Sequence, residues 1–308
     1  MKDKMKAHIF GPVPSRRLGR SLGIDLIPPK TCSYDCLYCQ VGLTTDKTIS
    51  RKTWVSVDEI IAELKNKLEL KPDCITLSGS GEPTLYNDCG KLISEIKKIT
   101  PVPVVVITNG SLLFMPEVRQ NLLQADIVLP SMDAGDEETF KKINRPVEGL
   151  TFDKMLQGLI DFRKEYKGKY LLEVFFIAGI NDSDEQVDKI AACIKKIQPD
   201  KVQLNTVSRP PAEKVNPVTK ARLEQIAKII GENAEVIADF KGAIDQKFKA
   251  TANDVLEMLM RRPCSADDIA AGLKISKLEV LKLTEELVKS NKIQAVLQND
   301  KTYYKSIV

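Results

Sequence analysis

Apolar positions along the first 230 residues form short β-branched runs that alternate with segments of helical spacing. Strands are predicted at 21–27, 74–77, 104–107, 127–129, 170–177 and 201–204. Helices are predicted at 57–70, 92–99, 117–123, 137–143, 152–166, 184–197 and 219–230. Ser56, followed by Glu59 three residues later, predicts a capping box at the first helix. Strands that alternate with helices predict a parallel sheet of right-handed β-α-β units.

The length of this alternating region favours an incomplete barrel. A closed eight-unit barrel takes about 250 residues, whereas six units fit the roughly 220 residues found here. We therefore expect an α/β fold, a partial (β/α)6 TIM-like barrel over residues 1–249. A doubly wound open sheet is the alternative.

The pattern changes near Lys249, where the alternation of strands and helices stops. Three helices are predicted next, at 251–260, 265–272 and 276–290, followed by strands at 293–298 and 301–306. Ser265 and Ser276 stand at the expected N-cap positions. Three helices and a terminal hairpin predict a winged helix-turn-helix domain over residues 250–308.

Polar and glycine-rich segments follow the predicted strands at the end where barrels of this kind carry their chemistry. A cysteine loop follows the first strand, and the others are 78–83, 108–110, Ser131 with Asp133, 179–182, and Asn205. One such segment is weak evidence, because glycine and asparagine are common in loops. Six at one rim indicate a site.

The cysteine loop contains Cys32, Cys36 and Cys39 in the spacing C-x3-C-x2-C. Three thiolates so close together can hold a [4Fe–4S] cluster and leave one iron open to a small molecule. Zinc is a competitor, but structural zinc sites usually show two separated ligand pairs, and His8 is the only histidine. A chance grouping in a buried loop is the remaining alternative.

Composition is that of an ordinary soluble protein, with 43% hydrophobic and 29% charged residues. No apolar run reaches the roughly 20 residues that span a bilayer. Residues 1–10 lack the apolar core of a signal peptide. The other cysteines are expected to be small buried hydrophobes: Cys74, Cys89, Cys193 and Cys264. These features favour a protein of the reducing cytoplasm without membrane contact, and an exposed cubane cluster would make it oxygen-sensitive.

Residues 8–20 are rich in glycine, proline and arginine and are predicted to form a loop. Arg16, Arg17 and Arg20 lie close together there, and a guanidinium fork suits phosphate or carboxylate. Arg145 is a second candidate for a substrate or cofactor carboxylate. A solvated basic loop is the alternative for the first three.

The cysteine loop resembles the signature of radical S-adenosylmethionine (SAM) enzymes. The resemblance implies a [4Fe–4S] cluster on Cys32, Cys36 and Cys39, with the amino and carboxylate groups of SAM on the open iron. An electron from a donor such as flavodoxin or ferredoxin then cleaves SAM to a 5′-deoxyadenosyl radical. Tyr38 matches the aromatic position beside the adenine.

The resemblance extends to the other loops. Residues 78–83 resemble the family's Gly-Gly-Glu loop, which implies that the backbone and Glu82 hold the SAM ammonium, although Ser80 replaces the first glycine. The implied cofactor-binding residues are Tyr38, Ser80, Gly81, Glu82, Asn109, Ser131, Asp133, Asn181 and Asn205. Local structure offers alternatives. Glu82 could cap the helix that follows it, and Ser131 and Asp133 could cap a helix at Asp136. Asn181 and Asp182 could simply start the next helix.

The stretches Gly-Pro-Val-Pro-Ser-Arg-Arg-Leu-Gly and Gly-Glu-Pro-Thr-Leu are similar to the branch grouped with tRNA wyosine-base synthases. Those enzymes carry additional N-terminal cysteines, whereas no cysteine precedes Cys32 here. We therefore expect a radical SAM enzyme. A tRNA base, a peptide and a small metabolite all fit as its substrate. No catalytic side chain is assigned.

The alternative function is an iron–sulfur redox regulator that binds nucleic acid through the winged helix. Residues 250–308 carry nine Lys/Arg against eight Asp/Glu, which gives no basic face for phosphate neutralisation. We expect that this domain does not bind duplex DNA alone.

Overall fold

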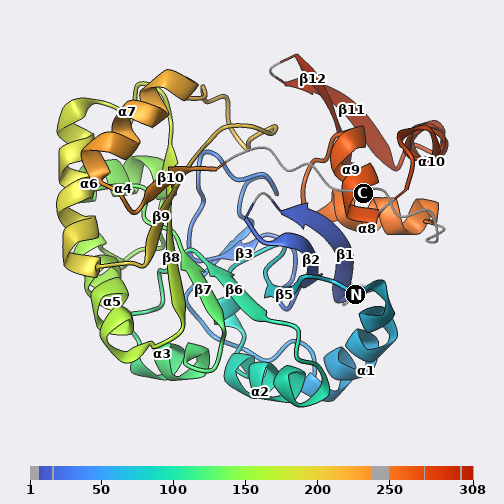
Figure 1. The fold of residues 1–308 in the computed structure, drawn as a ribbon, viewed down its shortest axis with the longest axis horizontal. Helices are drawn as coiled ribbons and strands as arrows, with labels where there is room; N and C mark the ends of the chain where they lie inside the picture. Colours follow the sequence, from blue (N-terminus) through green and yellow to red (C-terminus); the bar gives the residue numbers. More distant parts are fainter. Residues whose placement is uncertain (1–6, 16, 238–249, 274, 299, 308) are drawn as a thin grey trace.

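The computed structural model describes residues 7–15, 17–237, 250–273, 275–298 and 300–307. A curved sheet with helices along its outer side occupies most of the chain, and the C-terminal elements lie beside one edge of the sheet (Figure 1). Within the described residues no helix combines the length and apolar character needed to cross a membrane.

The main sheet has eight strands in the order β1-β2-β5-β6-β7-β8-β9-β10. All neighbours are parallel except β1 and β2, which form an antiparallel pair. The strands are β1 Ile9–Ser15, β2 Gly19–Ile24, β5 Cys74–Leu77, β6 Val104–Thr108, β7 Ile127–Pro130, β8 Lys169–Phe176, β9 Lys201–Thr206 and β10 Ala234–Val236. The central strands are buried along almost their whole length, as parallel strands covered on both faces should be.

Helices between the strands cover the outer face of the sheet. They are α1 Val57–Lys67, α2 Cys89–Ile99, α3 Pro116–Leu122, α4 Glu137–Asn144, α5 Phe152–Glu165, α6 Asp184–Ile197 and α7 Lys220–Ile230, with 3-10 turns η1 Leu68–Leu70 and η2 Pro83–Leu85. The predicted capping box of Ser56 and Glu59 is present. Helices on one side of a curved, open sheet agree with a partial barrel rather than a doubly wound sheet.

The six predicted strands correspond to β2 and β5 through β9, but the predicted loop at 8–20 is wrong. Residues 9–15 form β1, an edge strand with a bulge between Phe10 and Val13. Glycine and proline indicated a loop, yet an edge strand tolerates proline because one side of its backbone needs no partner. Sequence patterns also missed β10 and the two-residue pair β3 Thr31–Cys32 and β4 Asp46–Lys47.

The C-terminal module, the described part of residues 250–307, contains the predicted three helices and hairpin. They are α8 Ala252–Arg261, α9 Ala266–Leu273, α10 Lys277–Lys289, β11 Ile293–Gln298 and β12 Lys301–Ser306. Ser276 caps α10, and the Ser265 hydroxyl accepts a hydrogen bond from the Asp268 N–H at 3.2 Å. The domain boundary predicted at Lys249 lies outside the described residues.

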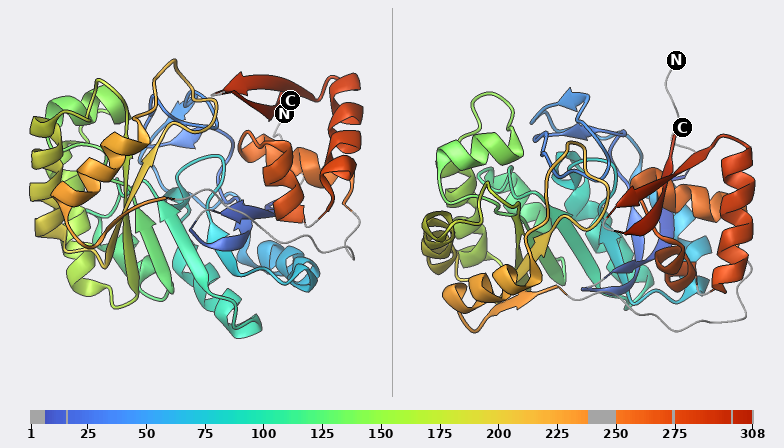
Figure 2. Two further views of the ribbon diagram at one scale, coloured as in Figure 1. Left: turned by 45° about the horizontal axis from the view of Figure 1, so that its top comes forward. Right: turned by 90° about the horizontal axis from the view of Figure 1, so that it is seen from above.

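The C-terminal module shares a hydrophobic core with the first strand. Phe10 and Val13 of β1 belong to the same buried cluster as Val255 and Met258 of α8 and Ile269 of α9. Helices α8 and α9 therefore cover the edge strand, as Figures 1 and 2 show. Covering the strand removes an exposed row of backbone groups that would otherwise pair with other chains.

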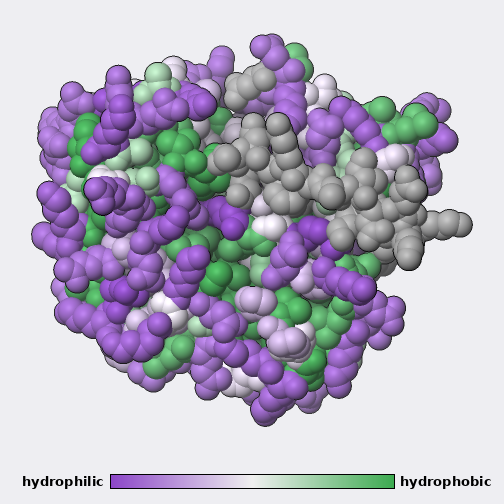
Figure 3. All heavy atoms as spheres, in the orientation of Figure 1, coloured by the Kyte–Doolittle hydropathy of each residue, from purple (hydrophilic) through white to green (hydrophobic). Residues whose placement is uncertain are grey.

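The module also reaches the other side of the open barrel. The Tyr303 hydroxyl on β12 donates to the Ser208 carbonyl, in the loop after β9, at 2.7 Å. Asp268 at the start of α9 lies 3.5 Å from Arg209 of the same loop. The module therefore contacts the barrel at two places, along β1 and at the loop after β9 (Figure 2). On the face of the molecule seen in Figure 3, hydrophilic side chains predominate at the periphery, with hydrophobic patches between them.

Candidate functional site

A cavity of about 360 Å³ opens at the carboxyl ends of the parallel strands. The predicted residues on its wall are Cys32, Cys36, Tyr38, Cys39, Gly81, Glu82, Asn109, Ser131 and Asn205. Ser80, Asp133 and Asn181 are buried behind this wall rather than on it. The topology thus brings most of the predicted site residues to one place, because parallel strands deliver their following loops to the same rim.

The three cysteines are free and half-buried on this wall. The Cys39 N–H donates to the Cys36 carbonyl at 3.1 Å, which makes a tight turn between them. Side-chain amides from the loop after β6 and from the end of α4 point at two of the sulfurs: Asn109 Nδ2 lies 3.4 Å from Cys32 Sγ, and Asn144 Nδ2 lies 3.4 Å from Cys36 Sγ. Such donors orient thiolate ligands and tune their charge.

The donor set fits an iron–sulfur cluster better than a single metal ion. Within the described ranges, no three His, Cys, Asp or Glu side chains converge on one ion-sized position. A cubane presents separate iron atoms to separate thiolates, so the sulfurs need not converge. Burial raises the pKa of Cys32 to about 12 and that of Cys36 well above its ordinary value. A positive centre bound beside them would favour their thiolate form.

Glu82 joins two loops of the rim. Its Oε1 accepts from the Thr84 N–H at 3.0 Å and from the Thr84 and Thr108 hydroxyls at 2.6 Å each. Its Oε2 accepts from the Asn109 N–H at 2.7 Å. Burial raises the pKa of Glu82, and these donors oppose the rise because they favour the charged form. The side chain caps η2, as the local alternative predicted, and still lines the cavity.

The loop that carries Glu82 is packed too closely for side chains at its glycines. A Cβ atom on Gly81 would lie 2.0 Å from the Thr31 carbonyl oxygen, and one on Gly79 would lie 2.3 Å from Asp25. Ser80 turns away from the cavity: its hydroxyl donates to Asp25 Oδ2 at 2.6 Å and its N–H reaches the same carboxylate at 3.1 Å.

Arg261 of α8 holds the far side of Asp25. The Arg261 Nε atom lies 3.4 Å from Asp25 Oδ2, and the guanidinium also donates to the Ala7 carbonyl at 2.7 Å. Both members of the pair are buried, at 7% exposure for Arg261 and 1% for Asp25. The C-terminal module therefore supports the Ser80 loop through one carboxylate.

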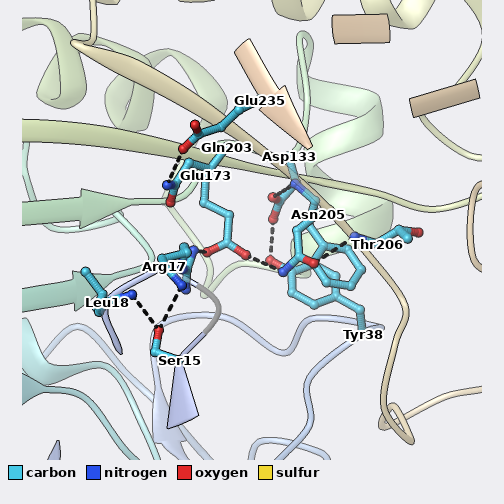
Figure 4. Close-up of polar contacts among 11 residues, drawn as sticks. Ser15, Arg17, Leu18, Tyr38, Asp133, Glu173, Gln203, Asn205, Thr206 and Glu235 are labelled. Atoms are coloured by element: carbon cyan, nitrogen blue, oxygen red, sulfur yellow. Dashed lines mark hydrogen bonds and ion pairs between the residues drawn. The ribbon is translucent and has the colours of Figure 1, made fainter. Parts of the chain in front are cut away.

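Tyr38 lies flat on Phe175, with ring centroids 3.9 Å apart and planes at 10°. Its hydroxyl donates to Asp133 Oδ2 at 2.5 Å (Figure 4). Asp133 also accepts from Asn144 Nδ2 at 2.8 Å and from the Phe175 N–H at 3.0 Å. Burial raises the pKa of Asp133 to about 6, although these three hydrogen bonds act to lower it. Asp133 thus fixes Tyr38 from behind, and Ser131 is the member of its loop on the cavity wall.

Asn181 is fully buried among backbone groups. Its Nδ2 donates to the Asp133 and Phe175 carbonyls at 2.8 and 2.9 Å, and its Oδ1 accepts from the Ile177 N–H. The cap of α4 is Asp136 itself, and the cap of α6 is Ser183. Neither Ser131, Asp133 nor Asn181 caps a helix, so those local alternatives are wrong.

Two residues at the base of the cavity were not predicted as a pair. Arg17, after β1, forms an ion pair with Glu173 of β8, and Asn205 Nδ2 of β9 donates to the other carboxylate oxygen of Glu173 at 2.8 Å (Figure 4). Glu173 was missed because it stands inside a run of apolar residues. It is the lone charge in the predicted strand 170–177, and that was the available signal.

The other predicted arginines lie elsewhere. Arg16 lies outside the described residues. Arg20 donates to the Leu70 and Lys71 carbonyls at 3.0 Å each, away from the cavity. Arg145 forms an ion pair with Glu213 and borders a separate surface depression.

Three further arginines line the cavity and were not predicted. Arg261 and Arg262 stand at the end of α8, and Arg209 stands in the loop after β9. The adjacent arginines at the end of an amphipathic helix were a signal, but local sequence does not show that α8 faces the barrel.

The model of the Radical SAM superfamily matches residues 26–194, more than half of the chain. A Brachyspira hyodysenteriae protein named GTPase Obg is 45% identical over 306 residues; the match covers 97% of this chain, and the chain spans 45% of that protein. A UPF0026 protein of Methanocaldococcus jannaschii is 35% identical, with 96% of this chain and 94% of that protein covered. A radical SAM methyltransferase from Sphaerobacter thermophilus has a similar fold, with TM-score 0.53, 18% identity, and 70% and 65% of the two chains covered.

Proposed function

The chain belongs to the radical SAM superfamily of enzymes, and we propose that Cys32, Cys36 and Cys39 hold a [4Fe–4S] cluster on which SAM binds. When bound, this pair of cofactors supplies a 5′-deoxyadenosyl radical by reductive cleavage. The observation that carries the proposal is that all three cysteines line one cavity with Gly81, Glu82 and other predicted rim residues.

The chain's own residues divide the work of holding these cofactors. Asn109 and Asn144 donate to the cysteine sulfurs, and Glu82 offers a carboxylate for the SAM ammonium while it anchors the loop after β6. Tyr38, held between Phe175 and Asp133, presents an aromatic ring for the adenine. Ser131 and Asn205 add polar groups to the wall.

We also propose that the C-terminal module is a winged helix-turn-helix unit within a domain of residues 250–308. The order of three helices and a hairpin supports this. No observation favours the redox-regulator alternative, because the module turns α8 and α9 toward the barrel and contributes arginines to the cavity. A role inside the enzyme accounts for these contacts.

Within the superfamily we propose the branch grouped with the tRNA wyosine-base synthases, on the two sequence stretches quoted above. An electron donor such as flavodoxin or ferredoxin would supply the reducing electron. The Brachyspira protein is named a GTPase, but we do not assign GTPase activity to the present chain. The sequence of the present chain contains no Gly-x4-Gly-Lys-Ser/Thr phosphate loop.

Anaerobic reconstitution tests the proposal. The protein should bind about four irons per chain, and addition of SAM and dithionite should release 5′-deoxyadenosine, measured by mass spectrometry. Cys32→Ala, Cys36→Ala and Cys39→Ala should each abolish both signals, whereas the buried Cys74→Ala should keep them. Full reconstitution of a triple variant would overturn the proposal.

A further inference from the structure

Three arginines of the cavity wall come from segments other than the strands of the barrel. Arg261 and Arg262 reach it from the end of α8, and Arg209 reaches it from the loop after β9. We call these three residues the arginine wall. They stand where the module bridges the open side of the barrel.

The arginine wall turns a cationic face to the cavity. The carboxylates nearest to it, Asp25 beside Arg261 and Asp268 beside Arg209, are absent from the cavity lining. The carboxylates that do line the cavity are Glu82 and Glu173. Glu82 is held by its own and the neighbouring loop, and Glu173 is paired with Arg17.

Arg209 has hydrogen-bonding capacity that the described residues do not use. Its side chain is 8% exposed, and its buried Nε–H finds no acceptor among them. Its single carboxylate contact is at the long distance of 3.5 Å to Asp268, which is itself occupied by the Ser265 N–H at 3.0 Å and hydroxyl at 2.9 Å. A buried donor without an acceptor is costly, so this position favours an added oxyanion.

Like charges gather at the same point. Burial lowers the pKa of Arg262, the neighbouring guanidinium of Arg209 lowers it further, and Asp268 acts in the opposite direction. Asp268 therefore lies near both guanidinium groups, and a further anion beside them would be attracted by both. A phosphate ester offers nearly two negative charges and three acceptor oxygens, and the guanidinium fork matches it in shape.

We propose that the arginine wall binds a phosphate group of the substrate. This assignment rests on the proposed radical SAM function and adds the substrate class to it. The barrel rim then holds the cofactors, while the C-terminal module and the β9 loop hold the phosphate. The module becomes the specificity element of the enzyme.

Titration calorimetry on the full, cluster-free protein with inorganic phosphate, at constant ionic strength in chloride buffer, tests the assignment. Wild type should bind phosphate, and Arg209→Gln and Arg262→Gln should each weaken binding about ten- to a hundredfold, as expected for a lost charge-assisted hydrogen bond. Arg163→Gln is the control, because Arg163 is an arginine that pairs with a carboxylate, Asp200, at 2.9 Å and does not line the cavity. Near-ultraviolet circular dichroism confirms that each variant is folded, and Arg209→Lys provides a second variant that keeps the charge.

Phosphate binding that is absent, or equal in wild type and both folded glutamine variants, would overturn the assignment. Acetate binding with the same affinity and the same dependence on Arg209 would make the site one for carboxylates and also overturn it. In reconstituted protein, Arg209→Gln should leave SAM affinity unchanged; an equal loss of SAM affinity would assign the wall to the cofactor. Since phosphate is titrated without the cluster, a failure of reconstitution leaves this result standing.

Discussion

Glu82 combines a structural role between two loops with a place on the cavity wall. Its carboxylate accepts four hydrogen bonds from three residues, Thr84, Thr108 and Asn109, and it lies on the cavity wall. Replacing Glu82 by glutamine would remove the negative charge. It would also put an NH2 group, which is a donor, where one carboxylate oxygen now accepts hydrogen bonds from N–H and hydroxyl donors. The residue therefore cannot be replaced isosterically without cost.

We predict that Glu82→Gln weakens SAM binding about ten- to a hundredfold, since a charge-assisted hydrogen bond contributes about 1.5–3 kcal/mol. The cluster should still assemble, because the cysteines are unchanged. Calorimetry with SAM on reconstituted protein measures the loss. Glu165→Gln, at the Arg119 pair outside the cavity, is the control. Equal SAM affinity in a folded Glu82 variant would exclude the ammonium role.

At this scale, sequence patterns found residues whose signals are local. The spacing of Cys32, Cys36 and Cys39 and the glycines around Glu82 are visible within ten residues. Arg209 could not be found this way. Its place on the cavity wall depends on which distant segments face it, and that is set by packing.

At the scale of elements, strands with continuous apolar runs were predicted well. Strand β5 has the predicted bounds, because four successive buried residues leave a clear pattern. Strand β1 was missed because its proline and glycine residues are tolerated at an edge. The same prolines are incompatible with a central strand. The position of residues 9–15 at the edge of the sheet, rather than their strand propensity, therefore allows them to form a strand.

The link between α8 and the Ser80 loop carries a prediction about stability. Asp25 and Arg261 form a buried pair, and removal of one member leaves a buried charge unpaired. We expect Arg261→Met to lower the free energy of unfolding by about 3–5 kcal/mol. Urea denaturation measures this change.

A double-mutant cycle with Asp25→Asn separates the pair from other losses. The two substitutions together should cost less than the sum of the single costs. Additive costs would show that Asp25 and Arg261 stabilise the protein independently. Arg163→Met, at an exposed ion pair, should cost less than about 1 kcal/mol.

Asp268 predicts a pH dependence at the start of α9. Burial raises its pKa, but Arg209 and the hydrogen bonds of Ser265 outweigh that effect, so the folded-state pKa is lowered. The unfolded chain then binds more protons near pH 4, and the stability from this group is lost as pH falls through the folded pKa. Asp268→Asn should remove that part of the acid slope in urea titrations between about pH 5 and pH 2. An unchanged slope would contradict the assignment.

At the scale of the whole molecule, β1 belongs to the core of the C-terminal module. The ring of Phe10 lies against Gly23 of β2, and the Arg261 guanidinium lies 5.0 Å from the ring centroid. Phe10→Ala should lower stability by about 3–5 kcal/mol, the range for large-to-small changes in a core.

The same packing predicts that barrel and module unfold together. Calorimetry should show one transition for wild type, and Phe10→Ala should shift it as a whole. Two separate transitions in wild type would show that the module has an independent core. Leu278→Ala, at a side chain 65% exposed on α10, should leave the transition within about 0.5 kcal/mol.

The shared core of β1 and the module has a consequence during synthesis. Residues 10 and 13 emerge from the ribosome long before residues 255–269 that cover them. At about 5–20 residues per second, the interval is on the order of 10–50 s. Throughout it, a nascent chain exposes an uncovered sheet edge with an apolar face. Chaperones that capture extended apolar segments would therefore meet this protein at its first strand, and its yield in cells would depend on how quickly translation delivers α8.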